Sequence, residues 1–185
     1  GEGVRTLHVD CDPQASLTAA CGIGDSAGRS LADVIGGALS GTLGLAAIVR
    51  PLGDNLALAP SDIALAQSEL GLVTRLGRET VLRRALAPLA GDFDAALIDC
   101  APSLGLLVVN ALTAAQGVLI PSAPEALALR GLRLFLTSLD QVKEALNPEL
   151  ETIGVLATFY DGRLNHHKEA LAAMQAGGLP LLPVT

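Results

Sequence analysis

Short apolar runs alternate along the chain with longer segments in which apolar residues recur at helical spacing. The runs are nearly continuous rather than alternating, which is typical of parallel strands covered on both faces. They predict five strands and a sixth candidate near the end of the chain: Thr6–Val9, Leu56–Ala59, Ala95–Ile98, Val118–Ile120, Ile153–Ala157 and Leu181–Val184.

The segments between the runs predict helices. Positions 70 to 89 carry apolar residues at helical spacing, namely Leu70, Val73, Leu76, Val81, Leu82, Leu86 and Leu89. The longest predicted helix runs from Leu127 to Leu146 and stops at Asn147, because the residue before a proline disfavours helical geometry. Gly36–Gly44 is rich in Gly and Ser and predicts a loop or a weak helix.

This alternation of strands and helices predicts an α/β fold. Right-handed crossovers imply an open, doubly wound, mostly parallel sheet flanked by helices on both faces. A length of 185 residues suits a single domain over residues 1–185, because two domains would each approach the lower size limit for an independent core. Half of the residues are hydrophobic, which excludes a disordered chain.

Composition and charge argue against several classes of nucleic-acid-binding protein. Aromatic residues form 2% of the chain, too few for a surface that stacks nucleic-acid bases. A net charge of -7 argues against a protein dominated by phosphate contacts, unless a basic patch is local or lies outside this chain. Three cysteines without a CxxC motif indicate reduced thiols in a cytoplasm. We predict no signal peptide and no membrane helix, and expect the natural start to precede Gly1 because it is not Met.

Aspartates directly follow two of the predicted strands. Ligands of open α/β sheets bind at the carboxyl ends of the strands, where Asp10, Asp12 and Asp99 lie. A carboxylate in this position can hold a magnesium ion or its waters beside a phosphate. An aspartate there is also a common helix cap, and for Asp99 the two interpretations are evenly balanced. Asp10 and Asp12 point the same way on an extended chain, so one could ligate metal while the other polarises a water.

Five ordered motifs resemble those of the ParA/Soj-type partition ATPases, the deviant Walker A group, and together they extend over nearly the whole chain. They are Asp10–Gln14 (DxDPQ), Leu97–Ser103 (LIDCPPS), Asn110–Ala115 (NALTAA), Val118–Leu132 (VLIPxxPExxALxGL), and Leu146–Pro148 with Thr158–Arg163 (LNP and TMYDxR).

This resemblance implies ATP or ADP and Mg²⁺ as cofactors. It also implies a face-to-face homodimer, non-specific DNA binding by the ATP-bound dimer, and a ParB-like partner that stimulates hydrolysis during chromosome or plasmid segregation. By the same resemblance Asp12 orients the attacking water, Asp10 and Asp99 belong to the magnesium shell mainly through water, and Thr158 and Phe159 approach the adenine. The implied location is cytoplasmic and nucleoid-associated, without a membrane partner.

The sequence departs from the family at both ends. The family's phosphate loop, KGGxGKT, has no counterpart here, and only Gly1–Val9 precede the DxDPQ motif. The chain also stops before the family's basic final segment. We therefore expect an ATPase domain truncated at both ends, inactive by itself. Loss of the phosphate-loop strand would leave Ala95–Ile98 with an unpaired edge, or force the sheet to close the gap.

Two other functions remain open. A chain that lacks the phosphate loop could be a pseudo-ATPase that serves as a protein-binding module or as a heterodimer partner of an intact ParA. A MinD-like membrane-cycling ATPase is a further possibility, although such proteins end in a basic amphipathic helix that this chain does not reach.

The remaining polar residues favour structural roles. Cys11 and Cys100 are predicted on neighbouring strands, where a small buried hydrophobe is favoured over a metal or redox link. The arginines between positions 75 and 84 are expected on a solvated helix face rather than on DNA. His166 and His167 are expected on a helix surface, and Ser103 is expected to cap the helix that follows it.

Overall fold

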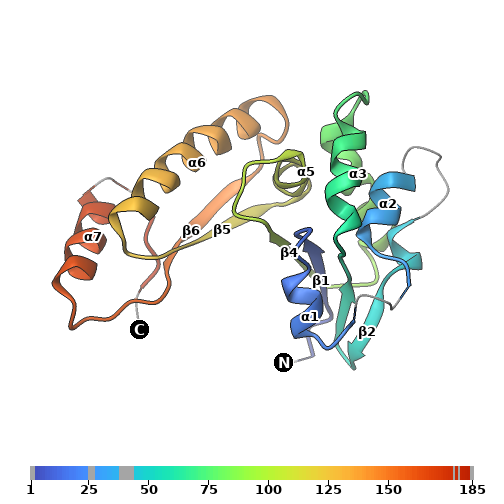
Figure 1. Ribbon diagram of the computed structural model, residues 1–185, viewed down its shortest axis with the longest axis horizontal. Helices are drawn as coiled ribbons and strands as arrows, with labels where there is room; N and C mark the ends of the chain where they lie inside the picture. The colour runs from blue at the N-terminus through green and yellow to red at the C-terminus, as the bar shows by residue number, and fades with distance from the viewer. Residues whose placement is uncertain (1–2, 25–27, 38–43, 177, 179, 184–185) are drawn as a thin grey trace. The chain divides into compact units, whose positions relative to one another are not determined.

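The computed structural model describes residues 3–24, 28–37, 44–176, 178 and 180–183 (Figure 1). The chain divides into two compact units, Gly1–Ala114 and Ala115–Thr185, which are described separately below. Two sequence predictions fall partly outside the described residues: positions 38–43 of the expected loop, and Val184 at the end of the last apolar run.

A four-stranded sheet forms the centre of the first unit. Its order is β2-β3-β1-β4, with β1 parallel to β3 and β4, and β2 antiparallel to β3. The strands are β1 (Thr6–Cys11), β2 (Arg50–Gly53), β3 (Leu56–Ala59) and β4 (Ala95–Cys100). The apolar runs predicted β1, β3 and β4. They missed β2, because Pro51 and Gly53 are residues that strands seldom contain.

Helices cover the sheet of the first unit. They are α1 (Ser16–Ala20), α2 (Leu31–Gly37), α3 (Ala64–Leu72), α4 (Val81–Leu86) and α5 (Leu106–Ala114), with single 3₁₀ turns η1 (Leu45–Ala47), η2 (Arg78–Thr80) and η3 (Ala87–Leu89). Alternate residues of β1, Leu7, Val9 and Cys11, point into one apolar core with leucines of α2, α3, α4 and α5. The period of two along β1 thus separates a core face from a face that carries Asp10.

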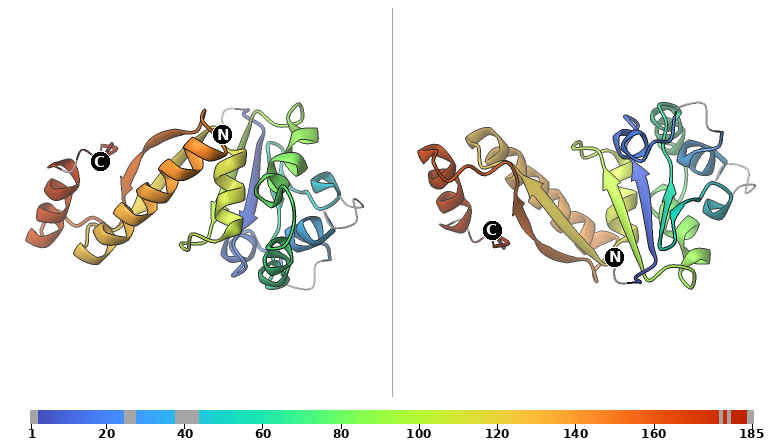
Figure 2. Two further views of the ribbon diagram at one scale, coloured as in Figure 1. Left: turned by 90° about the horizontal axis from the view of Figure 1, so that it is seen from above. Right: turned by 90° about the horizontal axis from the view of Figure 1, so that it is seen from below.

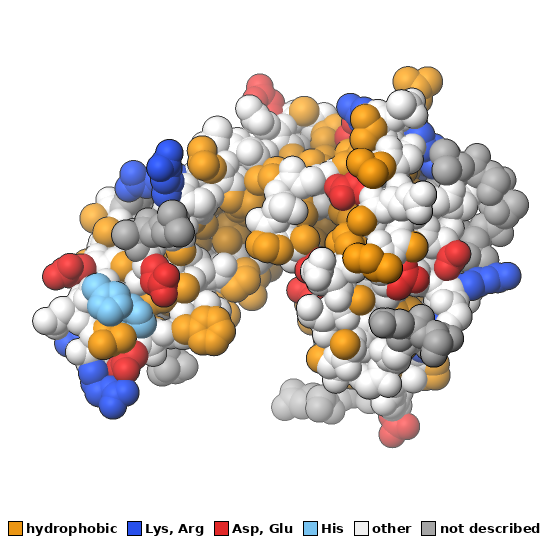
Figure 3. Space-filling model, viewed as in Figure 1, with side chains coloured by type: hydrophobic (Ala, Val, Ile, Leu, Met, Phe, Trp, Pro, Cys, Tyr) orange, Lys and Arg blue, Asp and Glu red, His pale blue; other side chains and the backbone are white. Residues whose placement is uncertain are grey.

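The predicted helical segment 70–89 is broken in the structure. Gly77 has a φ of 67°, a left-handed conformation that ends the helical path between α3 and η2. Leu70, Val73 and Leu76 lie on the surface rather than in the core. Hydrophobic side chains are visible over the α3 part of the first unit in Figure 3. The apolar spacing therefore detected the helices but overestimated their length and burial.

A parallel strand pair and two helices form the second unit. They are β5 (Gly117–Ser122), α6 (Ala126–Ala145), β6 (Glu151–Ala157) and α7 (Asn165–Ala176). Helix α6 runs alongside the strand pair (Figure 2), and its predicted stripe buries Leu132, Leu139 and Val142. Of the last apolar run, Leu181 forms a single bridge with Val155. The mostly parallel α/β architecture with flanking helices is confirmed, and the single-domain assignment stays a prediction.

One edge of β4 has no strand partner. β4 pairs with β1 along one side, and no strand within the described residues pairs with its other side. The four strands of the first unit form one sheet, and β5 and β6 pair with each other in the second unit. Leu97 in β4 is 58% exposed. Within the first unit, the outer edge of β4 is therefore unpaired among the described residues.

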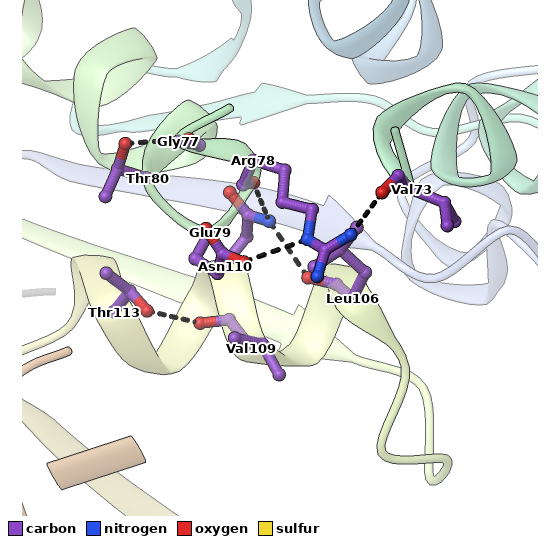
Figure 4. Close-up of polar contacts among 9 residues, drawn as sticks. All are labelled: Val73, Gly77, Arg78, Glu79, Thr80, Leu106, Val109, Asn110 and Thr113. Atoms are coloured by element: carbon purple, nitrogen blue, oxygen red, sulfur yellow. Dashed lines mark hydrogen bonds and ion pairs between the residues drawn. The ribbon is translucent and has the colours of Figure 1, made fainter. Parts of the chain in front are cut away.

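A buried asparagine ties α5 to the η2–α4 segment (Figure 4). The Asn110 Nδ2 group donates to the backbone carbonyls of Arg78 at 2.8 Å and Leu106 at 2.9 Å. Its Oδ1 accepts from the Leu82 backbone N–H at 3.1 Å. Asn110 is completely buried, so water cannot replace it as the hydrogen-bond partner of these backbone groups. One side chain thus satisfies polar groups at the first residue of η2 and near the start of α4 that would otherwise have no hydrogen-bond partner.

Replacing Asn110 with Ala should therefore lower the free energy of unfolding by about 2–3 kcal/mol, because it leaves the Leu82 N–H without its acceptor. Urea denaturation measures the change. Thr113→Val is the matched control: Thr113 is also buried in α5, but it donates only to the Val109 carbonyl of its own helix. An equal loss in both variants would contradict the assigned role of Asn110.

Candidate functional site

The carboxyl ends of β1 and β4 lie side by side in register. Asp10 pairs with Asp99, and Cys11 pairs with Cys100, the last residues of the two strands. The sequence motifs that carry these residues are 89 positions apart, and the parallel pairing brings them to one sheet edge. This confirms the expected neighbourhood of the two motif strands.

Asp10 is completely buried and holds the loop that follows β1. Its Oδ2 accepts from the Thr18 backbone N–H at 2.8 Å and from the Thr18 hydroxyl at 2.6 Å. Its Oδ1 accepts from the Asp12 N–H at 3.2 Å. Asp10 therefore binds an amide in the first turn of the short helix α1 and fixes the start of the loop, which accounts for a charged side chain in a buried position.

Asp12 is the first residue of this loop. Its Oδ1 accepts from the Gln14 N–H at 2.9 Å, while the side chain is only partly buried. The Asp12 backbone carbonyl accepts from the Ser61 hydroxyl at 2.8 Å, and the Ser61 N–H donates to the Thr18 hydroxyl at 2.9 Å. Residues from the ends of β1 and β3 thus form one network that positions Asp12.

Asp99 is exposed and lies in a region of negative charge. Partial desolvation, followed by repulsion from the carboxylates of Asp10 and Asp12, raises the pKa of Asp99 above its usual value. A cation at this edge would relieve that repulsion. Within the described ranges, no three His, Cys, Asp or Glu side chains are arranged to enclose a metal ion. Carboxylate oxygens are ligands that magnesium prefers, so the chemistry of Asp12 and Asp99 suits a magnesium ion with its water shell.

The two cysteines behind the carboxylates have different environments. Cys11 is buried in the core, while Cys100 is partly exposed. Their thiols are close enough to interact: a hydrogen bond with Cys100, together with burial, raises the pKa of Cys11, and the same hydrogen bond lowers the pKa of Cys100. The core position of Cys11 agrees with the expectation of a buried hydrophobe.

Thr158 and Phe159 follow β6 in the second unit. The Thr158 N–H donates to the Ser122 carbonyl at 3.0 Å, which places it beside the carboxyl end of β5. Phe159 has a φ of 56° and a side chain that is 90% exposed. A left-handed aromatic residue that packs on nothing within its unit is strained without a folding benefit, which is typical of functional positions.

Two structural expectations for polar residues need correction. His166 is exposed, as predicted, but His167 is buried, and its Nδ1 accepts from the Asp161 N–H at 3.0 Å. Ser103 does not cap α5. The Leu107 N–H near the start of that helix instead donates to Glu69 Oε1 of α3 at 3.1 Å. The carboxylate comes so close that a Cβ at Gly105 would lie 2.5 Å from it.

Sequence reasoning gave no role to three residues that the structure places in hydrogen bonds at or near the strand ends: Thr18, Ser61 and Glu69. Ser61 had a signal, because it follows the second predicted strand at the edge where ligands bind. Thr18 and Glu69 had none, since their roles depend on which segments meet in the fold. The expectation of a solvated helix face holds for the exposed Arg83 and Arg84 of α4. It does not hold for the partly buried Arg75 and Arg78, of which Arg78 binds Glu79 and the Val73 carbonyl.

The fold and the strand-end carboxylates define a P-loop NTPase-like α/β protein, and comparison with known proteins specifies the family. Residues 1–152 match the family described as an AAA domain. The chain is 41% identical over 162 residues to the chromosome partitioning protein ParA of Myxococcus xanthus, covering 87% of this chain and 56% of that protein. It is 38% identical over 164 residues to the sporulation initiation inhibitor protein Soj of Bacillus subtilis, covering 88% and 64%. An uncharacterised protein of Mycobacterium tuberculosis is 39% identical over 172 residues, covering 92% and 53%.

Solved structures agree with this assignment. A Mycobacterium smegmatis structure, described as cobyrinic acid a,c-diamide synthase with bound ATP analogue and magnesium, has a TM-score of 0.91 and 40% identity, covering 99% of this chain and 74% of that one. McdA from Cyanothece has a TM-score of 0.87 and 25% identity, covering 98% and 74%. The chain therefore belongs to the AAA domain family, among its ParA/Soj-type members. It spans between half and two thirds of the three relatives above.

No helix in the described part of the chain has both the length and the apolar character that crossing a membrane requires.

Replacing Asp99 with Asn should raise the stability of the metal-free protein at pH 7, by less than about 1 kcal/mol because the side chain is exposed and screened. The raised pKa means that the folded state favours protonated Asp99, so its charge destabilises the fold above that pKa. The difference in stability between the variant and wild type should therefore vanish below pH 3.8, the ordinary pKa of an aspartate. Urea denaturation at several pH values measures it.

Asp94→Asn is the matched control just before β4. Arg5 binds Asp94 at 2.8 Å and lowers the pKa of that carboxyl, so its stabilising contribution is present above pH 3.8 and is lost as pH falls through the lowered pKa. Asp94→Asn should therefore lower stability at pH 7, opposite in sign to Asp99→Asn. If both variants shifted stability in the same direction, the assigned repulsion at Asp99 would be wrong.

Proposed function

We propose that this chain is part of a ParA/Soj-type ATPase that acts in chromosome or plasmid partitioning. The observation that carries the proposal is the carboxylate edge, where Asp10 and Asp99 are in register and Asp12 lies at the opening of the adjacent loop. The names of the Myxococcus and Bacillus relatives support the partitioning role. Because the chain spans only part of those proteins, the proposal concerns the whole protein.

The three carboxylates would have different roles in ATP hydrolysis. Asp12, partly open and held by Ser61 and Gln14, would orient and polarise the attacking water. Asp99 would contact the water shell of a magnesium ion, and buried Asp10 would hold the loop and contribute its charge. When bound, magnesium supplies charge neutralisation at the phosphates. Nucleotide and magnesium in the Mycobacterium smegmatis structure support this cofactor assignment.

The nucleotide would bind with contributions that these 185 residues do not supply. The sequence contains no Gly-rich phosphate loop with its lysine. Thr158 and Phe159 would approach the adenine, where the exposed Phe159 ring offers an apolar face. The proposal further includes a homodimer, non-specific DNA binding, a ParB-like partner and a cytoplasmic, nucleoid-associated location, all by analogy with the family.

A second candidate function is favoured by the unpaired edge of β4. Within the first unit the outer edge of β4 has no strand partner among the described residues, and such an edge can pair with another chain. A nucleotide-free binding module would associate with a partner, or with an intact ParA, in the absence of ATP. Gel filtration with and without ATP separates the two functions, because the ATPase requires nucleotide for dimerisation.

In the full-length protein, Asp12→Ala should retain ATP-Mg²⁺ binding and reduce hydrolysis by about 100-fold or more, because it removes the group that polarises water. Nucleotide affinity and phosphate release are measured on the same preparation. Asp62→Asn is the control: Asp62 lies at the end of β3 nearby, but its carboxylate only accepts from the Ala64 N–H. Unimpaired hydrolysis by Asp12→Ala would refute the assignment of Asp12.

Replacing Phe159 with Asn should lower ATP affinity while stability is kept or raised by at most about 1 kcal/mol, because Asn adopts the left-handed conformation more readily. Isothermal titration and thermal unfolding measure the two effects. Tyr160→Leu serves as the control, since Tyr160 contacts the His167 ring within the unit. Wild-type ATP affinity in Phe159→Asn would remove Phe159 from the nucleotide site.

A further inference from the structure

Cys11 and Cys100 are a matched pair on two neighbouring strands. Each is the last residue of its strand, and the two are partners in the β1–β4 register. Both side chains lie on the core face of the sheet, beside the start of α5, where the Cys11 thiol donates to the Leu107 carbonyl. Two cysteines in register on adjacent strands are far closer than two cysteines placed at random in a chain of this size.

The backbone positions suit a covalent link. Neighbouring strands lie about 4.8 Å apart, and a disulfide bridges Cα atoms that are about 4.4–6.8 Å apart. Both thiols lie on the same face of the sheet and make long hydrogen bonds, Cys11 Sγ to the Leu107 carbonyl at 3.9 Å and Cys100 Sγ to the Ile98 carbonyl at 3.7 Å. The pair stands at the strand ends, where the chain leaves the hydrogen-bonded ladder and the last residues can adjust toward disulfide geometry.

The two thiols differ in how far solvent can reach them. Cys100 is partly exposed, whereas Cys11 is buried. An oxidant from solvent therefore reaches Cys100 first, and Cys11 lies behind it as the only neighbouring thiol among the described residues. An exposed cysteine with a buried resolving cysteine is the arrangement of a redox-sensitive dithiol.

We propose that Cys11 and Cys100 form a reversible dithiol–disulfide pair whose oxidant is a hydroperoxide. The proposal does not depend on ATP hydrolysis. The disulfide would join the loop that carries Asp12 to the segment that follows Asp99. Disulfides in reducing compartments are typically transient and regulatory rather than structural, which matches two free thiols in the folded chain.

The chemistry balances in two steps. The sulfur of Cys100 attacks one oxygen of the hydroperoxide, the O–O bond breaks, and the products are a sulfenic acid on Cys100 and one water or alcohol. The Cys11 thiol then attacks the sulfenic sulfur, forming the S–S bond and releasing a second water. The two thiols lose two electrons and two protons, and the hydroperoxide is reduced. A small dithiol reverses the step by thiol–disulfide exchange.

The test uses the full-length protein in a Cys21→Ser background, treated with hydrogen peroxide and then blocked with an alkylating reagent. Trypsin cleaves after arginine, so Cys11 falls in peptide 6–29 and Cys100 in peptide 85–130. Cys21 shares peptide 6–29 with Cys11, and its removal makes any link between the two peptides unambiguous. We expect the linked peptides as the main form of Cys100, lacking two hydrogen atoms, in a monomeric chain. Dithiothreitol should restore both thiols.

Cys100→Ser in the same background is the matched variant, and it should leave Cys11 unlinked and reduced under the same peroxide dose. The mapping in the Cys21→Ser protein needs neither site cysteine to be replaced, so it decides the question even if that variant folds poorly. Oxidation of Cys100 to sulfinic acid without a link, links only between chains, or unchanged alkylation of both cysteines would each overturn the proposal.

Discussion

The parallel pairing of β1 with β4 is the contact on which the rest of the site depends. Six consecutive register pairs hold the two strands together, and the last two place aspartate beside aspartate and cysteine beside cysteine. The same register turns Leu7, Val9 and Cys11 toward the core. A slip by one residue would turn the buried carboxylate of Asp10 into that core and the apolar side chains away from it. Hydrophobic burial on one face thus fixes the position of the charges on the other.

Hydrogen bonds to Asp10 then fix the conformation of the loop that follows β1. A buried carboxylate is costly unless its oxygens are satisfied, and Asp10 accepts three hydrogen bonds from Thr18 and Asp12. The loop passes through Ala15, which has a φ of 53° although it is not glycine. Such a conformation costs about 1–2 kcal/mol and persists only where surrounding contacts determine it. The network through Thr18 and Ser61 provides those contacts, so the position of Asp12 follows from buried hydrogen bonds rather than from local preference.

The sequence predicted the parts of the fold that depend on local pattern. Continuous apolar runs identified five strands, and the helix 127–146 began and ended within one residue of α6. The apolar pattern did not predict strand β2, because Pro51 and Gly53 interrupt it. Leu76 fitted helical spacing but is fully exposed, since periodicity records spacing and not what covers a face. At the site, the strand-end rule found Asp10, Asp12 and Asp99, whereas Thr18 and Glu69 act across tertiary contacts that no local pattern encodes.

Two aspartates near the ends of β4 have opposite electrostatic environments. Asp94 precedes the strand and Asp99 is its second-last residue, and their pKa values shift in opposite directions. Asp94 is neutralised by Arg5, which lowers its pKa, so its charge favours the folded chain. Asp99 faces the carboxylates of Asp10 and Asp12, and together with partial desolvation they outweigh the opposing effects of the Cys100 backbone N–H and His8, so its pKa is raised and its charge opposes folding. A cation bound at this edge would relieve the repulsion at Asp99, which supports the proposal that Asp99 belongs to the water shell of a magnesium ion.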